Sequence, residues 1–232
     1  SWNHTTINLV DPPGALSLLG ETVMALRAVD AVILVVNASS EIRSELLRIW
    51  ARVTTLSLPC LLFLNDLDTD DTSLDEAVAI CQRELGIMPL PMSLPYRTGS
   101  QLNGVLDLAQ QCLIASRKES PTIQQLPIPE HEQAVVGEAR KCVQEGIAEH
   151  DDRLLEQYLA VGELTQEDLM KGLRLGVQAK TIVPLYSGSA TEIVGIVPLL
   201  NAIVDLLPSP MERATTAPLT GLHPDTGERI TR

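Results

Sequence analysis

The chain has 232 residues, and 30 acidic against 17 basic side chains give it a net charge of −13 and a pI near 4.7. Hydrophobic residues make up 45% of the sequence, which suits one large domain or a domain with an inserted lobe. No apolar run approaches about 18 residues and no signal-peptide pattern opens the sequence, so we expect neither a membrane span nor a secretory leader. The acidic balance argues against non-specific DNA binding, which needs clustered Lys and Arg, but leaves docking on a ribonucleoprotein surface open.

The first part of the chain alternates short apolar runs with segments of helical period. One predicted helix has Ser73 as its N-cap, Glu76 three residues on and Gly86 as its stop signal. The alternation predicts an α/β fold with a doubly wound parallel sheet, whose ligand site lies at the carboxyl ends of its strands. Strands are predicted at 7–10, 31–36 and 60–64, and helices at 16–29, 42–56 and 73–86.

A different pattern begins near residue 94, where short strand-like pieces alternate with prolines and glycines as far as residue 129. Helical segments follow, and then a strand at 181–186 and a helix at 194–207 resume the α/β alternation. We therefore expect a core made of 1–93 and 177–210, an inserted mixed α+β lobe at 94–176, and a polar, turn-rich linker toward a further domain at 211–232. Helices of the lobe are predicted at 130–149, 151–161 and 165–178.

The four cysteines, Cys60, Cys81, Cys112 and Cys142, are widely spaced and include no C-x-x-C pair. A zinc site or a redox motif is therefore not expected. Free cysteines in apolar segments are usually buried thiols, so the pattern predicts a reduced, cytoplasmic protein.

The first motif is Asp11-Pro12-Pro13-Gly14, at the end of the first predicted strand, which fits D-x-x-G. In guanine-nucleotide-binding domains this Asp holds the Mg²⁺ shell indirectly, and the Gly amide meets the γ-phosphate. Taken alone, the motif is better explained as an Asp that caps the following turn.

The second motif, Asn65-Asp66-Leu67-Asp68, follows the third predicted strand and fits N-K-x-D with the Lys replaced. A carboxylate there accepts hydrogen bonds from N1–H and N2–H₂ of guanine, whereas adenine would leave it unpaired. The alternative is an acidic, solvated loop, since Asp70 and Asp71 follow closely.

The third motif, Ser187-Gly188-Ser189-Ala190, follows the late strand and fits the short loop whose backbone amide contacts the guanine O6 atom. Small residues permit that close approach. By itself the stretch is better explained as an ordinary Gly-containing turn before a helix.

Together the three motifs occur in order, each after a predicted strand, and on these residues the chain resembles translational GTPases of the elongation factor G family. It is most similar to the divergent second bacterial form, and the similarity extends over about residues 5–213. Further stretches that carry it are Leu106-Asp107-Leu108, Leu155-Glu156-Gln157-Tyr158-Leu159, Gly162-Glu163-Leu164-Thr165 and Asp205-Leu206-Leu207-Pro208-Ser209-Pro210.

The resemblance implies a G domain that binds GTP or GDP with Mg²⁺ and acts on the ribosome in translocation. Asp11 and Gly14 would then serve the γ-phosphate side, with Asp11 indirectly on Mg²⁺. Asn65 and Asp68 would serve the base, and Ser189 with Ala190 its O6 atom.

The sequence also departs from the family pattern. It contains no G-x-x-x-x-G-K-[ST] loop to cradle the phosphates, so we expect a piece of a longer protein that lacks the phosphate loop and the first switch. A natural chain that has lost these parts is the alternative. Ala15 replaces the His that orients the attacking water, so no catalytic residue is assigned, and Asp66 brings a carboxylate where the family has Lys.

Three hypotheses follow from these motifs and departures. The first is a GTP-binding piece of an elongation-factor-G-like protein, with GTP hydrolysis in the intact parent and an inactive isolated chain. The second is a degenerate, non-hydrolysing G domain that acts as a ribosome- or protein-binding module. The third, an unrelated doubly wound enzyme that uses Asp11 as an acid or phospho-acceptor, is disfavoured by the ordered trio of loops.

Overall fold

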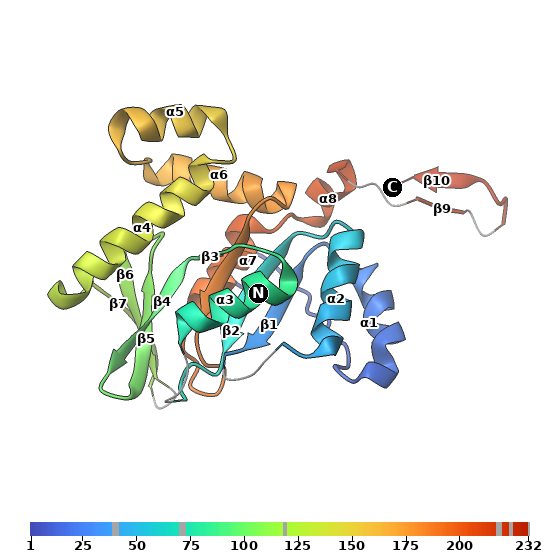
Figure 1. The fold of residues 1–232 in the computed structure, drawn as a ribbon. Helices are drawn as coiled ribbons and strands as arrows, with labels where there is room; N and C mark the ends of the chain where they lie inside the picture. Colours follow the sequence, from blue (N-terminus) through green and yellow to red (C-terminus); the bar gives the residue numbers. More distant parts are fainter. Residues whose placement is uncertain (39–41, 70–72, 118–119, 217–219, 223–224, 232) are drawn as a thin grey trace.

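The described residues form two four-stranded sheets with helices packed on them and a two-stranded ribbon near the C-terminus (Figure 1). This computed structural model describes residues 1–38, 42–69, 73–117, 120–216, 220–222 and 225–231. The first sheet is parallel and four-stranded, in the order β1-β2-β8-β3, and the predicted α/β fold is thereby confirmed. Its strands are β1 (Val32–Asn37), β2 (Cys60–Asn65), β8 (Val183–Ser187) and β3 (Pro89–Pro91).

The central strand β2 is apolar on both faces because both faces are covered. Leu62 and Leu64 pack in a cluster with residues of α1, α2 and α3. Leu61 and Phe63 point to the opposite face, into a cluster that includes residues of α7. The helices are α1 (Leu19–Leu26, after a 3₁₀ turn at Leu16–Leu18), α2 (Ser44–Thr55), α3 (Leu74–Leu85) and α7 (Ile196–Leu206).

Helix α3 begins and ends where its sequence signals predict. Ser73 is the N-cap, and its Oγ accepts a hydrogen bond from the Glu76 amide at 3.4 Å. Gly86 ends the helix with φ at +66°, in the left-handed region that glycine enters without steric cost.

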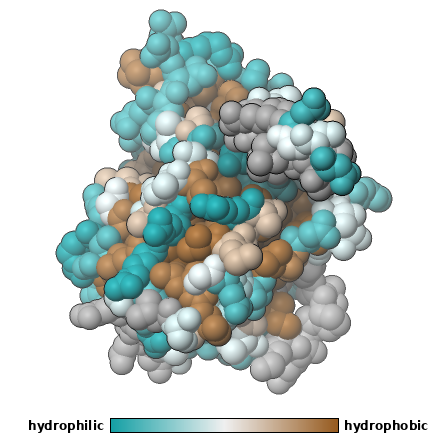
Figure 2. Space-filling model, turned by 90° about the vertical axis from the view of Figure 1, so that its right-hand side faces the viewer, coloured by the Kyte–Doolittle hydropathy of each residue, from teal (hydrophilic) through white to brown (hydrophobic). Residues whose placement is uncertain are grey.

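The prediction of a strand at residues 7–10 is wrong. These residues pair with no strand in the described part of the chain, and Leu9 and Val10 are 78% and 58% exposed. A strand is stable only beside a partner, and within the described residues β1 pairs with β2 alone. The side of the molecule on which α1 lies accordingly carries a broad hydrophobic area (Figure 2).

The second sheet is antiparallel, in the order β4-β5-β6-β7, and lies in the stretch predicted to be an inserted α+β lobe. Three helices follow it, and Val143 and Ile147 of α4 share one apolar cluster with Leu106 of β5 and Leu61 of β2. The two sheets are therefore joined by a continuous core. The elements are β4 (Ser93–Thr98), β5 (Gln101–Asp107), β6 (Cys112–Arg117), β7 (Ser120–Leu126), α4 (Gln133–Ala148, after a 3₁₀ turn at Glu130–Glu132), α5 (Asp152–Val161) and α6 (Gln166–Ala179).

The segment predicted to be a turn-rich tail is partly regular. Helix α8 (Pro210–Thr216) begins with a capping box, in which the Ser209 amide donates to Glu212 at 2.7 Å and the Glu212 amide donates to Ser209 Oγ at 3.3 Å. Proline at the first helical position loses no hydrogen bond, so Pro210 starts this helix and does not prevent it. Strands β9 (Thr220–Leu222) and β10 (Arg229–Thr231) pair as an antiparallel ribbon.

Two of the four cysteines are buried as predicted. Burial raises the pKa of the Cys60 thiol to about 12 and that of Cys81 to about 11, so both stay protonated and unreactive at neutral pH. Cys142, in contrast, is exposed. Among the residues that the structure describes, no helix combines the length and the apolar character needed to cross a bilayer.

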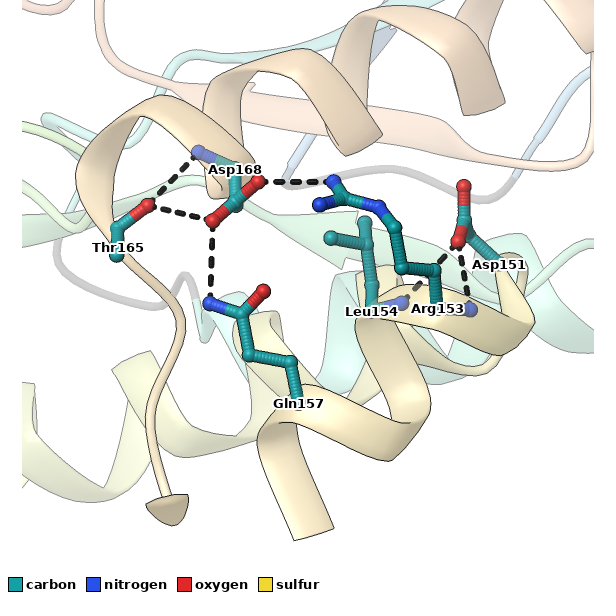
Figure 3. A network of polar contacts seen from close by, with 6 residues as sticks. All are labelled: Asp151, Arg153, Leu154, Gln157, Thr165 and Asp168. Atoms are coloured by element: carbon teal, nitrogen blue, oxygen red, sulfur yellow. Dashed lines mark hydrogen bonds and ion pairs between the residues drawn. The ribbon is translucent and has the colours of Figure 1, made fainter. Parts of the chain in front are cut away.

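A network of polar contacts ties α5 to the start of α6 (Figure 3). Thr165 caps α6 by accepting from the Asp168 amide, and its hydroxyl donates to the Asp168 carboxylate at 2.8 Å. Arg153 and Gln157 of α5 donate to the same carboxylate at 2.9 and 3.1 Å. These bonds, the one from Thr165 first and then those from Arg153 and Gln157, hold the pKa of Asp168 at about 2, below its usual 3.8.

We expect the stability that Asp168 contributes to be fully present above pH 3.8 and to be lost as the pH falls through about 2, because folding depresses its pKa. Asp168→Asn should remove this pH dependence. Urea unfolding of the wild type and the variant at several pH values from 2 to 6 gives the free energy of unfolding of each as a function of pH. The difference between the two curves is the contribution of the Asp168 carboxylate. Glu156→Gln, an exposed position of α5, is the control, and a constant difference between wild type and Asp168→Asn across this range would contradict the assignment.

Candidate functional site

The predicted motif residues of the second and third loops lie at the carboxyl ends of neighbouring parallel strands. Asn37 at the end of β1 is the register partner of Asn65 at the end of β2, and β8 ends beside them at Ser187. We refer to residues 65–69 as the β2 loop and to residues 187–195 as the β8 loop. The Gly188 amide donates to the Leu64 carbonyl at 2.9 Å, and the Leu67 amide donates to the Gly188 carbonyl at 3.1 Å, so the two loops are joined through their backbones.

The Asn65 side chain adds a third link between the loops. Its Oδ1 accepts a hydrogen bond from the Ala190 amide at 2.8 Å, and its Nδ2 donates to Asp66 Oδ1 at 2.8 Å. The Asn65 side chain therefore ties the β2 loop to the β8 loop.

Asp66 is held by both of its carboxylate oxygens. Asn65 donates to Oδ1, and Asn37 Nδ2 donates to Oδ2. Its backbone has φ at +63°, in the left-handed region that aspartate tolerates better than most residues. Asp66, which stands where the N-K-x-D motif has Lys, is thus hydrogen-bonded to the side-chain amides of Asn37 and Asn65.

Asp68 is half-buried, and its Oδ1 has no hydrogen-bond partner in the described part of the chain. An unpaired buried carboxylate oxygen costs on the order of 1–3 kcal/mol, and a ligand that brings N–H donors to it would recover that cost. Asp68 is therefore an acceptor site next to the Asn65–Ala190 link.

The β8 loop is a close-packed turn that requires its glycines. A Cβ on Gly188 would lie 2.1 Å from the Val194 carbonyl oxygen, and one on Gly195, which has φ at +80°, would lie 2.2 Å from the Ser187 carbonyl oxygen. The Ser189 and Val194 backbones exchange hydrogen bonds at 3.0 and 2.9 Å, and Ser189 Oγ accepts from the Glu192 amide. The amides of Ser189 and Ala190 are thus both engaged within the chain.

The Asp11-Pro12-Pro13-Gly14 turn is anchored on α1. Thr22 Oγ1 of that helix donates to the Pro13 carbonyl at 3.1 Å. Asp11 and Ala15 are exposed. Within the described residues no group of three or more His, Cys, Asp or Glu side chains could hold a metal ion.

Three residues of this region were not singled out from the sequence as site residues: Asn37, Ser93 and Arg97. The sequence does mark Asn37 as the start of a loop at the carboxyl end of a predicted strand, by the same signal that identifies Asn65, but it assigns the Asn37 side chain no role. Ser93 and Arg97 belong to β4, and nothing in the sequence distinguishes them from other polar residues of a strand. Their position depends on how the second sheet packs against the first.

Polar loops at the carboxyl edge of an open α/β sheet are the place where domains of this kind bind ligands, nucleotides among them. Residues 1–209 match the family model of the elongation factor Tu GTP-binding domain, and the chain belongs to this family. It is also similar to a protein from Thermus thermophilus of known crystal structure, with 28% identity and a TM-score of 0.80 over 95% of this chain. The match spans 34% of that protein's length. The chain is thus a GTP-binding G domain of the elongation-factor type.

We expect Gly188→Ala to destabilise the protein by about 3 kcal/mol, because the added methyl group meets a backbone carbonyl that cannot move without opening the β8 loop. Urea unfolding measures the change. Gly137→Ala is the matched control: Gly137 lies in the exposed part of α4 with nothing within 4 Å of an added Cβ, so this variant should gain about 0.5–1 kcal/mol. Equal effects of the two substitutions would contradict the packing argument.

Proposed function

We propose that this chain is the guanine-nucleotide-binding part of an elongation-factor-G-like GTPase that acts on the ribosome during translocation. The observation that carries the proposal is the unpaired, buried Asp68 Oδ1 beside the Asn65–Ala190 link. Guanine presents two adjacent donors, N1–H and N2–H₂, to a carboxylate in that position, and adenine presents neither.

The residues of the two loops would share the base between them. Asp68 would accept from its N1 and N2 groups, and the Ala190 amide would donate to its O6 atom. Because that amide donates to Asn65 Oδ1 in this structure, O6 would share or replace the Asn65 bond. Ser187, Gly188 and Ser189 would keep the loop compact, and Asp66 would hold Asn65 in place.

On the phosphate side the chain offers fewer groups that could contact a nucleotide than on the base side. Asp11 supplies one exposed carboxylate and Gly14 one backbone amide, with nothing within 4 Å of an added Gly14 Cβ. Mg²⁺ in nucleotide sites is held by one or two carboxylates with the phosphates and water as its other ligands, so a single Asp11 is compatible with an indirect role. The sequence itself has no phosphate-binding loop to complete the site.

We further propose the division into a core of residues 1–93 and 177–210, an inserted lobe of 94–176 and a connection at 211–232. The change from parallel to antiparallel pairing between β3 and β4 supports the first boundary. A cytoplasmic location follows from the proposed action on the ribosome.

A second candidate function is a G domain that binds a ribosome or a protein partner and does not hydrolyse GTP. Two substitutions favour it. Ala15 offers no polar atom where the family has the water-orienting His, and Asp66 replaces the Lys of the base motif. The guanine site proposed above is common to both candidates, so the first test addresses base recognition.

We expect the 232-residue chain to bind GMP more weakly than micromolar, because it lacks the amides and the Lys of a phosphate loop, but to prefer GMP over AMP by at least about tenfold. Amide chemical-shift titrations with the two nucleotides measure both quantities. Shifts by GMP should concentrate in residues 65–69 and 187–190. Equal shifts by AMP, or none by GMP, would refute the base site, and micromolar affinity would refute the expected weakness.

Asp68→Asn should weaken GMP binding by about tenfold or more and should favour XMP, since the Asn amide donates to the carbonyl that xanthine carries in place of the guanine amino group. The matched control is Asp75→Asn, an exposed carboxylate in the first turn of α3, which should leave both affinities unchanged. A change of the same size in Asp75→Asn would indicate a general charge effect.

A further inference from the structure

The first strand of the inserted lobe, β4, faces the β2 and β8 loops with two of its polar side chains. Leu94 and Tyr96 pack in the apolar cluster that β4 shares with α4. Ser93 and Arg97 point the other way, because alternate residues of a strand lie on opposite faces. These two polar residues are the ones that contact the loops.

Ser93 makes the contact with the β8 loop. Its Oγ accepts from the Ser187 amide at 3.0 Å, and Ser187 Oγ donates to the Ser93 carbonyl at 3.2 Å. Both residues are fully buried. Ser187 directly precedes Gly188, so the beginning of the β8 loop is fixed to the lobe.

Arg97 makes the contact with the β2 loop. One of its terminal nitrogens donates to the Leu67 carbonyl and, at 3.4 Å, to the Thr69 carbonyl. The other donates to the Ser100 carbonyl at 3.1 Å in the β4–β5 turn. The two loop carbonyls flank Asp68 on either side, so the guanidinium holds the backbone from which the unpaired carboxylate projects.

A β-bulge lies at the point where Arg97 leaves the sheet. Tyr96 pairs with Gly104 and Arg97 pairs with Leu102, so Asn103 of β5 has no counterpart on β4. Gly104 allows the close approach of the next strand, since a Cβ there would lie 2.5 Å from the Ile114 carbonyl oxygen. Bulges bend a strand locally and redirect the neighbouring side chains, and here the bulge lies opposite the residue that reaches the β2 loop.

We propose that Arg97 is a positioning residue for base selectivity: it holds the carbonyl groups of Leu67 and Thr69, the residues before and after Asp68, so that the Asp68 carboxylate is positioned to accept from the two donors of guanine. The proposal rests on the proposed guanine site. Since Arg97 belongs to the inserted lobe, it also makes the base site depend on where β4 lies. A charged donor on two carbonyls fixes a loop more firmly than a neutral one. The planar guanidinium reaches the β2 loop with one terminal nitrogen and the Ser100 carbonyl with the other, an arrangement that the single ammonium group of Lys does not reproduce.

The test compares wild type, Arg97→Ala and Arg97→Lys as full 232-residue chains. Affinities for GMP and for IMP, which lacks the 2-amino group, are measured by amide-shift titration. We expect Arg97→Ala to weaken GMP binding by about tenfold and to bring the GMP/IMP affinity ratio close to one, with Arg97→Lys in between. A residue that only stabilises the fold would leave this ratio unchanged.

Hydrogen exchange without nucleotide gives the second readout. In Arg97→Ala the amides of residues 66–69 should exchange at least about tenfold faster than in wild type, while those of β2 stay protected. Arg83→Ala, which removes an exposed guanidinium paired with Glu84 on α3, is the control and should change neither readout.

The outcomes separate the two proposals. If wild type binds GMP selectively but Arg97→Ala retains both the affinity and the GMP/IMP ratio, the role of Arg97 is refuted and the guanine site stands. If wild type does not bind GMP, the guanine site is refuted and the selectivity role falls with it. Unchanged exchange of residues 66–69 in Arg97→Ala refutes the positioning role in either case.

Discussion

The burial of β2 on both faces is the constraint on which the rest of the structure depends. Leu61, Leu62 and Leu64 are completely inaccessible, so β2 must lie in the middle of the sheet with helices above and below it. Parallel pairing with β1 on one side and β8 on the other then places the ends of three strands at one edge. The polar cluster forms there because Asn37, Asn65 and Ser187 are the residues at which these strands end.

A second consequence of this arrangement is that the inserted lobe and the parallel sheet share one hydrophobic core. Its sheet shares an apolar cluster with β2 and α7, and its first strand begins two residues after β3 ends. Ser93 is therefore carried directly from the parallel sheet into contact with Ser187. A core that spans both sheets transmits displacement of one to the other, because close-packed interiors deform little.

The sequence predicted the parts of the fold that local signals determine. Continuous apolar runs identified β1 and β2, and Ser73, Thr165 and Gly86 marked helix ends that the structure confirms. The strand at 7–10 failed because apolar composition does not supply a pairing partner. In the site, Asn65 and Ala190 are 125 residues apart in sequence. The order of the motifs along the chain predicted that their two loops would both belong to the site, because each motif follows a strand of the same parallel sheet. Arg97 could not be found in this way, since its contact depends on a bulge and on the packing of two sheets.

The two departures from the family pattern affect different halves of the chemistry. A carboxylate at position 66 would weaken nucleotide binding if its charge faced the anionic phosphates. In the structure both Asp66 oxygens accept hydrogen bonds from asparagine amides. The carboxylate thereby fixes Asn65, which in turn holds the Ala190 amide. The substitution thus replaces the Lys of the motif with a carboxylate that is hydrogen-bonded to Asn65 and Asn37. Ala15 has no such compensation, because a methyl group neither donates nor accepts a hydrogen bond. These contacts are consequently in keeping with the proposed base recognition, whereas Ala15 contributes nothing to the hydrolysis of GTP.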